Sequence, residues 1–119
     1  MFQMKRTEAA ALALAAAFTV TAAGCSTTSG LLEHDPETFT STKPAPDLVA
    51  CLSETWTKRN QDVRVTPMTD GQRIIIHNPA LHGTIAMVEV RPVDTGSRAL
   101  YWKGAGLTGW TREDLRSCL

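Results

Sequence analysis

The alanine-rich run from Ala9 to Ala23 constrains this chain more than any other feature, because it removes the first fifth of the residues from the fold. Nine of the 15 alanines lie in this run, which contains no charged residue. As a helix it would be about 22 Å long, too short for a hydrocarbon core of about 30 Å, and it has no polar face. Lys5 and Arg6 precede it. This order is typical of a secretory signal peptide over residues 1–24.

The run ends in Ala22-Ala23-Gly24-Cys25. This arrangement resembles the lipobox of bacterial lipoproteins, with Ala22 standing where leucine is commoner. The resemblance implies that diacylglycerol is attached to the thiol of Cys25, that the signal is cut before it, and that a further acyl chain such as palmitate is added to the new amine. Two or more chains anchor a protein stably to a membrane. Ser26 after the cysteine is similar to the outer-membrane sorting pattern, which implies an outer-membrane anchor and a domain facing the periplasm. An ordinary secreted protein with a spare thiol is the alternative.

Residues 26–46 have the composition of a linker, rich in Ser, Thr, Pro and Gly with few apolar residues. With Cys25 they are predicted to form a flexible tether over 25–46, whose 21 linker residues reach about 25 Å. His34 lies among acidic residues, which favours solvated charge over a metal site. The alternative is that the apolar residues of this segment, Leu31, Leu32 and Phe39, dock on the domain.

Residues 47–119 are predicted to fold as one small domain. Asp47 suits a helix N-terminus, and Leu48, Leu52 and Trp56 recur on one face of a helix over 47–59. Thr111 followed by Asp114 matches a capping box, which predicts a short second helix through Cys118.

Between these helices the sequence alternates as strands do, and turn signals such as Asp70-Gly71 separate the segments. Strands are expected over 62–66, 73–77, 84–90 and 98–103. Short links make such a sheet antiparallel, and a sheet this small needs helices over one face. We therefore predict an α+β fold: a small two-layer domain with an antiparallel sheet of three to four strands, an N-terminal helix and a short C-terminal helix.

Three cysteines cannot all pair within the chain. If Cys25 is the anchor, Cys51 and Cys118 remain, and in an exported protein they are predicted to form a disulfide. Such a bridge would stabilise the domain by about 4 kcal/mol in the chain-entropy model. Two buried free thiols are the alternative.

No motif for catalysis or for a cofactor occurs in the sequence: it lacks nucleophile elbows, phosphate loops and paired metal ligands. His77 and His82 flank a loop, but no third metal ligand lies near them. The formal net charge is zero, which argues against a nucleic-acid partner. We therefore expect no enzyme, no metal and no cofactor.

Aromatic residues near glycines form the candidate partner surface: Gly96, Ser97, Tyr101, Trp102 and Trp110. Such residues bind sugars or proteins in some domains, although a place in the core is the commoner role. Four arginines on predicted strands favour a polar, solvated sheet face: Arg64, Arg73, Arg91 and Arg98.

Short motifs of the domain resemble a set of small uncharacterised proteobacterial lipoproteins: Ala50-Cys51-Leu52 with Trp56, Pro67 to Gly71, Gly96-Ser97 with Tyr101, and Trp110 with Cys118. That resemblance implies no particular activity. Gly96-Ser97 and Tyr101-Trp102-Lys103-Gly104 are faintly similar to lipoprotein lysozyme inhibitors, although the helix over 47–59 argues against that fold. We expect a lipid-anchored binding or structural module that meets an envelope protein or glycan. The alternative is an inhibitor of an envelope enzyme such as lysozyme, acting through 94–97.

Overall fold

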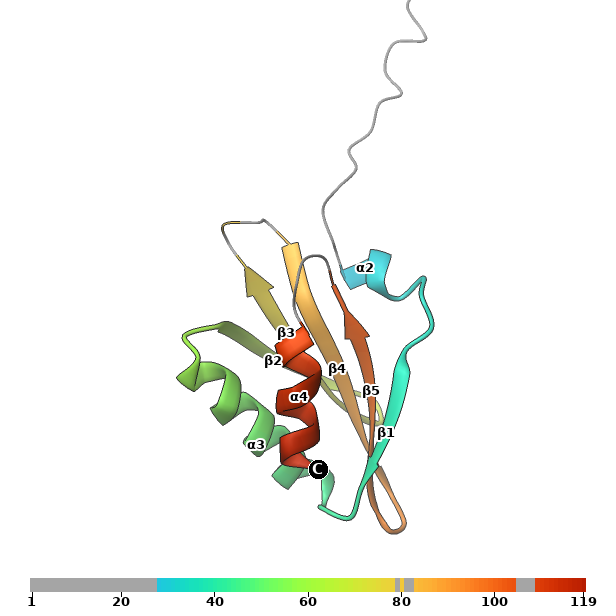
Figure 1. Cartoon of the computed structure of the whole chain (residues 1–119). Coiled ribbons are helices and arrows are strands. Elements are labelled where there is room, and N and C mark those ends of the chain that lie inside the picture. Colours follow the sequence, from blue (N-terminus) through green and yellow to red (C-terminus); the bar gives the residue numbers. More distant parts are fainter. Residues whose placement is uncertain (1–27, 79, 81–82, 105–108) are drawn as a thin grey trace, which may run out of the picture.

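The computed structural model describes residues 28–78, 80, 83–104 and 109–119, and within them five antiparallel strands form one sheet (Figure 1). The elements in chain order are α2 (Thr28–Leu31), β1 (Glu37–Ser41), α3 (Ala45–Lys58), β2 (Asp62–Met68), β3 (Gly71–Asn78), β4 (Gly83–Val93), β5 (Gly96–Lys103) and α4 (Gly109–Cys118). The strands lie in the order β1-β5-β4-β3-β2. The predicted α+β class and antiparallel sheet are confirmed.

The two long helices cover one face of the sheet, and their apolar side chains form the main core. Leu48, Leu52 and Trp56 of α3 are fully buried and pack with side chains of every central strand. On the strands the core contains Ile74, Ile76, Ile85, Ala86, Val88, Val90, Ala99 and Tyr101. The helix side chains, which repeat every 3.6 residues, therefore pack on strand side chains that repeat every two residues.

The predicted tether is wrong for most of its length. Residues 37–41 form β1, which pairs with β5 from Glu37 opposite Tyr101 to Ser41 opposite Ser97. Leu31 of α2 is 5% exposed and packs on Met87 and Trp102. The sheet therefore has five strands instead of three to four, and the folded part begins before residue 47. The alternative of docking holds for Leu31 and Phe39, whereas Leu32 is 45% exposed.

Both predicted helix caps are wrong. Helix α3 begins at Ala45 after Pro44, so Asp47 lies in its first turn and is not the cap. A carboxylate in this position still interacts favourably with the positive end of the helix dipole. Helix α4 begins at Gly109, so Thr111 and Asp114 lie inside it. Both side chains have tertiary partners: Thr111 shares a hydrogen bond with the Tyr101 hydroxyl, and Asp114 accepts a hydrogen bond from Trp56 of α3.

The contact between Asp114 and α3 joins the two helices through a buried carboxylate. Trp56 Nε1 donates to Asp114 Oδ2 at 3.1 Å, and Arg59 donates to both carboxylate oxygens at 2.6 and 2.9 Å. This bidentate pair holds the pKa of Arg59 above its ordinary value.

A disulfide makes the second link between the helices. Cys51 of α3 and Cys118 of α4 are bonded, with their Cα atoms 5.8 Å apart, and 67 positions separate them in the chain. The predicted pairing is confirmed. The link joins the first long helix to the last, so the closed loop contains β2 to β5 and leaves α2 and β1 outside it.

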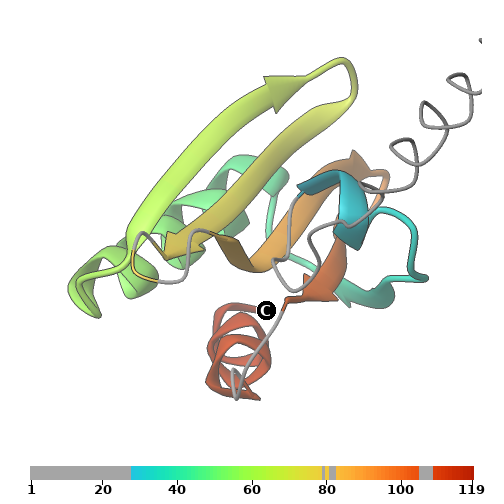
Figure 2. The same cartoon turned by 90° about the horizontal axis from the view of Figure 1, so that it is seen from above.

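Helix α2 lies on the opposite face of the sheet from α4, as the view along the strands shows (Figure 2). It covers only the end of that face where β5 finishes, through Leu31 on Trp102. The remainder of this face carries no helix from the described residues. The domain is therefore a two-layer fold with one largely open sheet face.

Candidate functional site

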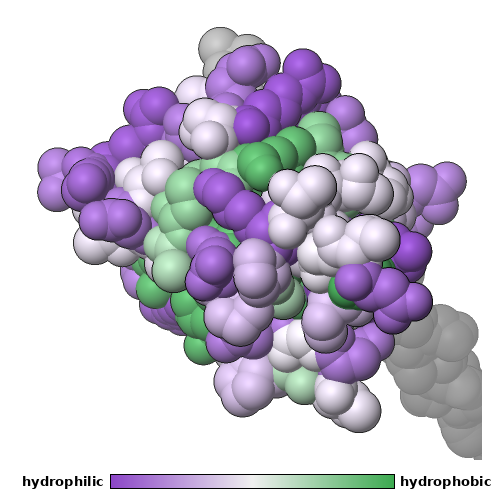
Figure 3. All heavy atoms as spheres, turned by 90° about the horizontal axis from the view of Figure 1, so that it is seen from below, coloured by the Kyte–Doolittle hydropathy of each residue, from purple (hydrophilic) through white to green (hydrophobic). Residues whose placement is uncertain are grey.

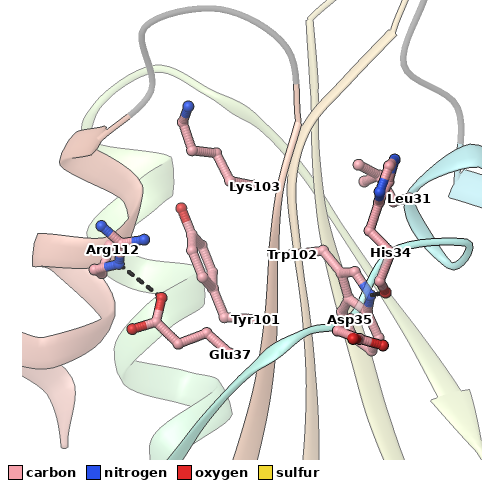
Figure 4. A pocket seen from close by; sticks show the side chains of 8 residues that line it. All are labelled: Leu31, His34, Asp35, Glu37, Tyr101, Trp102, Lys103 and Arg112. Carbon is pink, nitrogen blue, oxygen red and sulfur yellow. Dashed lines mark hydrogen bonds and ion pairs between the residues drawn. The ribbon is translucent and has the colours of Figure 1, made fainter.

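The described residues form a pocket of about 230 Å³ at the α2 end of the domain (Figure 4). It lies where the segment after α2 crosses β5 and where α4 begins. The residues that line it are Leu31, His34, Asp35, Glu37, Tyr101, Trp102, Lys103 and Arg112. Three elements distant in sequence meet there, so the pocket exists only in the folded domain.

An ion pair between β1 and α4 forms one side of the pocket. Arg112 Nε donates to Glu37 Oε1 at 2.8 Å, and the Arg112 guanidinium lies 5.8 Å from the centre of the Tyr101 ring. The hydrogen bond to Glu37 raises the pKa of Arg112 above its ordinary value. This arginine is therefore engaged on two sides, which leaves it less available to a ligand.

The hydroxyl of Tyr101 also points toward this side of the pocket (Figure 4). It shares a hydrogen bond with the Thr111 hydroxyl, and the residue is 2% exposed. Burial raises its pKa above the ordinary value of about 10. A phenol with a raised pKa stays protonated at neutral pH, so Tyr101 does not act as a general base there.

The other side of the pocket consists of Trp102 and the segment after α2. Trp102 Nε1 donates to the His34 carbonyl at 3.0 Å, which fixes that segment to β5. The Lys103 ammonium group is exposed and makes no ion pair with any described residue. Lys103 is therefore the cation of the pocket that is best placed to meet an anionic group.

The described part of the chain brings no nucleophile beside a histidine, and it contains no group of three or more metal-ligating side chains. His77 lies at the end of β3, whereas His82, its predicted neighbour across the loop, lies outside the described residues. The geometry of the pocket suits the binding of a polar group better than acid–base chemistry.

The predicted partner residues do not form one surface. Tyr101 belongs to the core on the helix side, whereas Trp102 is 6% exposed and lies on the opposite face. Trp110 is partly buried at the start of α4, with the Arg59 guanidinium 5.0 Å from its ring centre. The alternative of a core role therefore holds for both Tyr101 and Trp102, because each is needed to fill one face of β5.

Gly96 and Ser97 lie at the opposite end of the domain, after the turn between β4 and β5. Ser97 is fully buried and donates to the Lys43 carbonyl at 2.9 Å. Gly96 has a φ of +145°, and a Cβ atom there would lie 2.1 Å from the Ser41 carbonyl oxygen. These two residues hold the turn against the chain after β1. In the segment 94–97, only Asp94 and Thr95 are exposed.

An apolar hollow of about 430 Å³ lies near this turn, between the start of α3 and the turn before β3. Figure 3 shows this end of the molecule, where apolar surface lies exposed between hydrophilic side chains. Ala45, Val90 and Pro92 supply part of its lining. Nothing in the described residues indicates what would fill it.

The open sheet face carries the four arginines that the sequence marks as polar. Arg73 lies between the buried Ile74 and the preceding turn, and its cross-strand partner is Glu89. Since successive side chains alternate between faces, the residues that point away from the helices include Arg64, Arg73, Glu89, Arg91, Arg98, Ile75 and Leu100. The four arginines share this face as predicted, but the face is not simply solvated, because Glu89, Met87 and Trp102 on it are buried.

Glu89 is the centre of this face, with a side chain only 4% exposed. Arg73 donates to Oε2 at 2.7 Å and Arg91 donates to Oε1 at 2.9 Å. Arg91 also lies 3.5 Å from Asp70. The buried carboxylate therefore holds two guanidinium groups in place. Arg98, which is exposed, makes no ion pair with a described residue. The sequence signal for Glu89 was its position between two apolar residues in a strand, which places it on the polar face without revealing its burial.

Comparison of the chain with protein-family models, with curated proteins and with solved structures finds no match. The described residues contain no helix with both the length and the apolar character needed to cross a bilayer. The predicted signal peptide, 1–24, and the predicted lipidation site, Cys25, lie outside the described residues. The case for function therefore depends on the sequence signals and on the surfaces described above.

Proposed function

We propose that this protein is a lipoprotein of the cell envelope, anchored in the outer membrane by acyl chains on Cys25, whose domain binds a protein partner without catalysis. The signal-like segment before Cys25 supports the anchor. The bond between Cys51 and Cys118 supports an exported domain, because structural disulfides persist in oxidising compartments such as the periplasm.

The observation that carries the binding role is the open sheet face built around Glu89. Arginine is enriched at protein interfaces, and the buried Glu89 fixes two of its arginines before any partner arrives. Such order lowers the entropy lost on binding. Arg98, which lacks an ion pair with a described residue, would meet a carboxylate of the partner.

A protein partner suits this face better than a glycan. Sugar sites usually offer exposed aromatic rings, but Tyr101 and Trp102 are 2% and 6% exposed. The face instead presents guanidinium groups beside the half-buried Ile75 and Leu100, a mixture that resembles the core and rim of protein interfaces.

Two experiments test the two parts separately. Metabolic labelling with a palmitate analogue should mark the wild type and spare Cys25→Ala, and equal labelling of both would refute the anchor. For the partner, a photo-crosslinking amino acid is placed on the open face at Thr66 or Thr38, and on the helix side at Ala50 or Glu113 as matched exposed controls.

We expect one defined protein adduct from the open-face positions, absent from the helix-side positions and lost in Arg98→Glu. The matched charge reversal Arg116→Glu, on an exposed residue of α4, should leave the adduct unchanged. Equal adducts from both sides, an adduct that survives Arg98→Glu, or an adduct with glycan alone would each contradict the proposal.

A further inference from the structure

We propose that the α2 end of the domain lies directly against the bilayer surface, with the turn between β4 and β5 pointing away from it. This inference rests on the proposed anchor at Cys25. It concerns a membrane-contact surface, namely the end of the domain around Leu32 and Lys103, where α2, the end of β3 and the end of β5 lie together (Figure 1).

The length of chain between the anchor and the fold carries the argument. Thr28 is the first described residue, only three positions after Cys25. Three residues span at most about 11 Å when fully extended. A flexible tether up to residue 46 would have reached about 25 Å, but that tether does not exist, because residues 37–41 belong to the sheet.

The segment after α2 is held firmly enough to transmit this constraint. Leu31 packs against Met87 and Trp102, and Trp102 Nε1 bonds the His34 carbonyl at 3.0 Å. A few residues later Glu37 pairs with Arg112 at 2.8 Å. The anchor is thus connected to a point on the rigid domain, so the lipid chains draw this end, and no other, to the membrane.

The opposite end must then stand far from the bilayer. Strand β4 runs from the α2 end to the far turn with 11 residues, a length of about 35 Å at the usual rise of a strand. This distance is about three times the reach of the anchor segment, so Thr95 in the far turn cannot approach the surface unless the domain lies flat.

Among the described residues of the α2 end, exposed charges of both signs occur, so the argument for this orientation rests on the anchor length and not on charge. Leu32 is one of two exposed large apolar residues in the described chain, and the exposed Lys103 would favour anionic headgroups. Glu33 and Asp35 are also exposed, and their carboxylates would repel anionic headgroups. The orientation should therefore be similar on neutral and anionic bilayers.

This orientation also places the open sheet face at the side of the domain, with its strands running away from the membrane. A partner standing in the periplasm reaches Arg98 and the Glu89 cluster without contact with lipid. Partners that need the pocket beside Lys103 would have to approach at the level of the headgroups.

The test uses the full, lipidated protein in vesicles and measures how close two positions lie to lipid headgroups. With Cys25 acylated and Cys51 bonded to Cys118, a cysteine introduced by Leu32→Cys or by Thr95→Cys is the free thiol to be labelled with a fluorophore. Glu33→Cys serves as a second α2-end variant. Vesicles of phosphatidylcholine, with or without phosphatidylglycerol, contain headgroup nitroxide quenchers.

We expect several times stronger quenching at position 32 than at position 95 in both kinds of vesicle. Insertion of 20 Gly and Ser residues before Thr28 should remove most of this difference, because such a linker reaches about 25 Å. Equal quenching at both positions of the uninserted protein would overturn the orientation. A difference that survives the insertion would overturn the argument from tether length.

Failure of the anchor is distinguishable from failure of the orientation. If the protein does not float with the vesicles, the proposed lipidation is wrong. If it floats and the two positions are quenched alike, the anchor stands and the orientation is wrong.

Discussion

Reduction of the disulfide between Cys51 and Cys118 should destabilise the domain strongly while leaving its packing nearly intact. The bridge closes a loop of 67 positions, and the chain-entropy model assigns about 4 kcal/mol to a loop of that length. Small domains are stable by only about 5–15 kcal/mol in total. A loss of this size corresponds to a fall in Tm of about 16–32 °C for a domain of this length.

Two perturbations separate the covalent link from the packing of the sulfur atoms. A reductant breaks the bond and keeps every other atom, whereas the double variant Cys51→Ala, Cys118→Ala also removes the sulfur of the fully buried Cys118. Urea unfolding of the mature domain, with and without reductant, measures the first. Unfolding of the double variant in reductant measures the remaining packing contribution, which we expect to be smaller.

Cys25→Ala is the matched control, since it removes the one cysteine outside the bridge, and its unfolding curve should be unchanged. If reduction shifts the urea midpoint by no more than experimental error, the reasoning from loop closure is wrong. The same conclusion follows if alkylation without reductant modifies both Cys51 and Cys118.

Three further predictions concern single residues. Asp114→Ala leaves the buried Trp56 indole N–H without its acceptor, so we expect a loss of about 1–3 kcal/mol in urea unfolding, whereas the exposed neighbour variant Glu113→Ala should cost little. Gly96→Ala places a Cβ 2.1 Å from a backbone carbonyl at a positive φ, so its Tm should fall well below that of the wild type; an unchanged Tm would contradict the described turn. The pKa of Tyr101, the chain's single tyrosine, is raised by burial, so phenolate absorbance should appear above pH 10 in the folded protein. Since the folded state holds this proton more tightly than the unfolded chain, the associated stability is present below the ordinary pKa and is lost as pH rises through the folded value; a titration near 10 with no alkaline loss of stability would refute it.

The local patterns of the sequence predicted the elements whose burial is repetitive. Leu48, Leu52 and Trp56 marked α3, and Ile74 with Ile76 marked β3, because each set repeats with the period of its own backbone. The cysteine count predicted the bridge once Cys25 had been set apart. The open polar face of β3 to β5 followed from the same alternation that predicted the core.

The elements that the sequence did not reveal depend on partners distant along the chain. Strand β1 offers only the partly buried Phe39 as an apolar contact to the core, and it becomes a strand because β5 has an edge to pair with. Thr111 and Asp114 have the spacing of a capping box, but in the fold they lie inside α4, where they bond the Tyr101 hydroxyl and donors on α3. Strand β2 runs two residues beyond the expected range of 62–66 and includes Pro67, which is tolerated because β2 is an edge strand among the described residues.

The sequence by itself determined the signal-like segment, the proposed anchor at Cys25, the disulfide pair and the α+β class, because each depends on residue type, count or local period. Only the tertiary structure decided that residues 28–46 belong to the domain, that Tyr101 and Trp102 are buried on opposite faces of β5, and that Glu89 holds two arginines in place. The physical reason is common to all three. A strand edge, a buried hydroxyl or a carboxylate pairs with residues that the fold brings close to it. These residues are distant along the chain, so local sequence patterns do not predict the pairing.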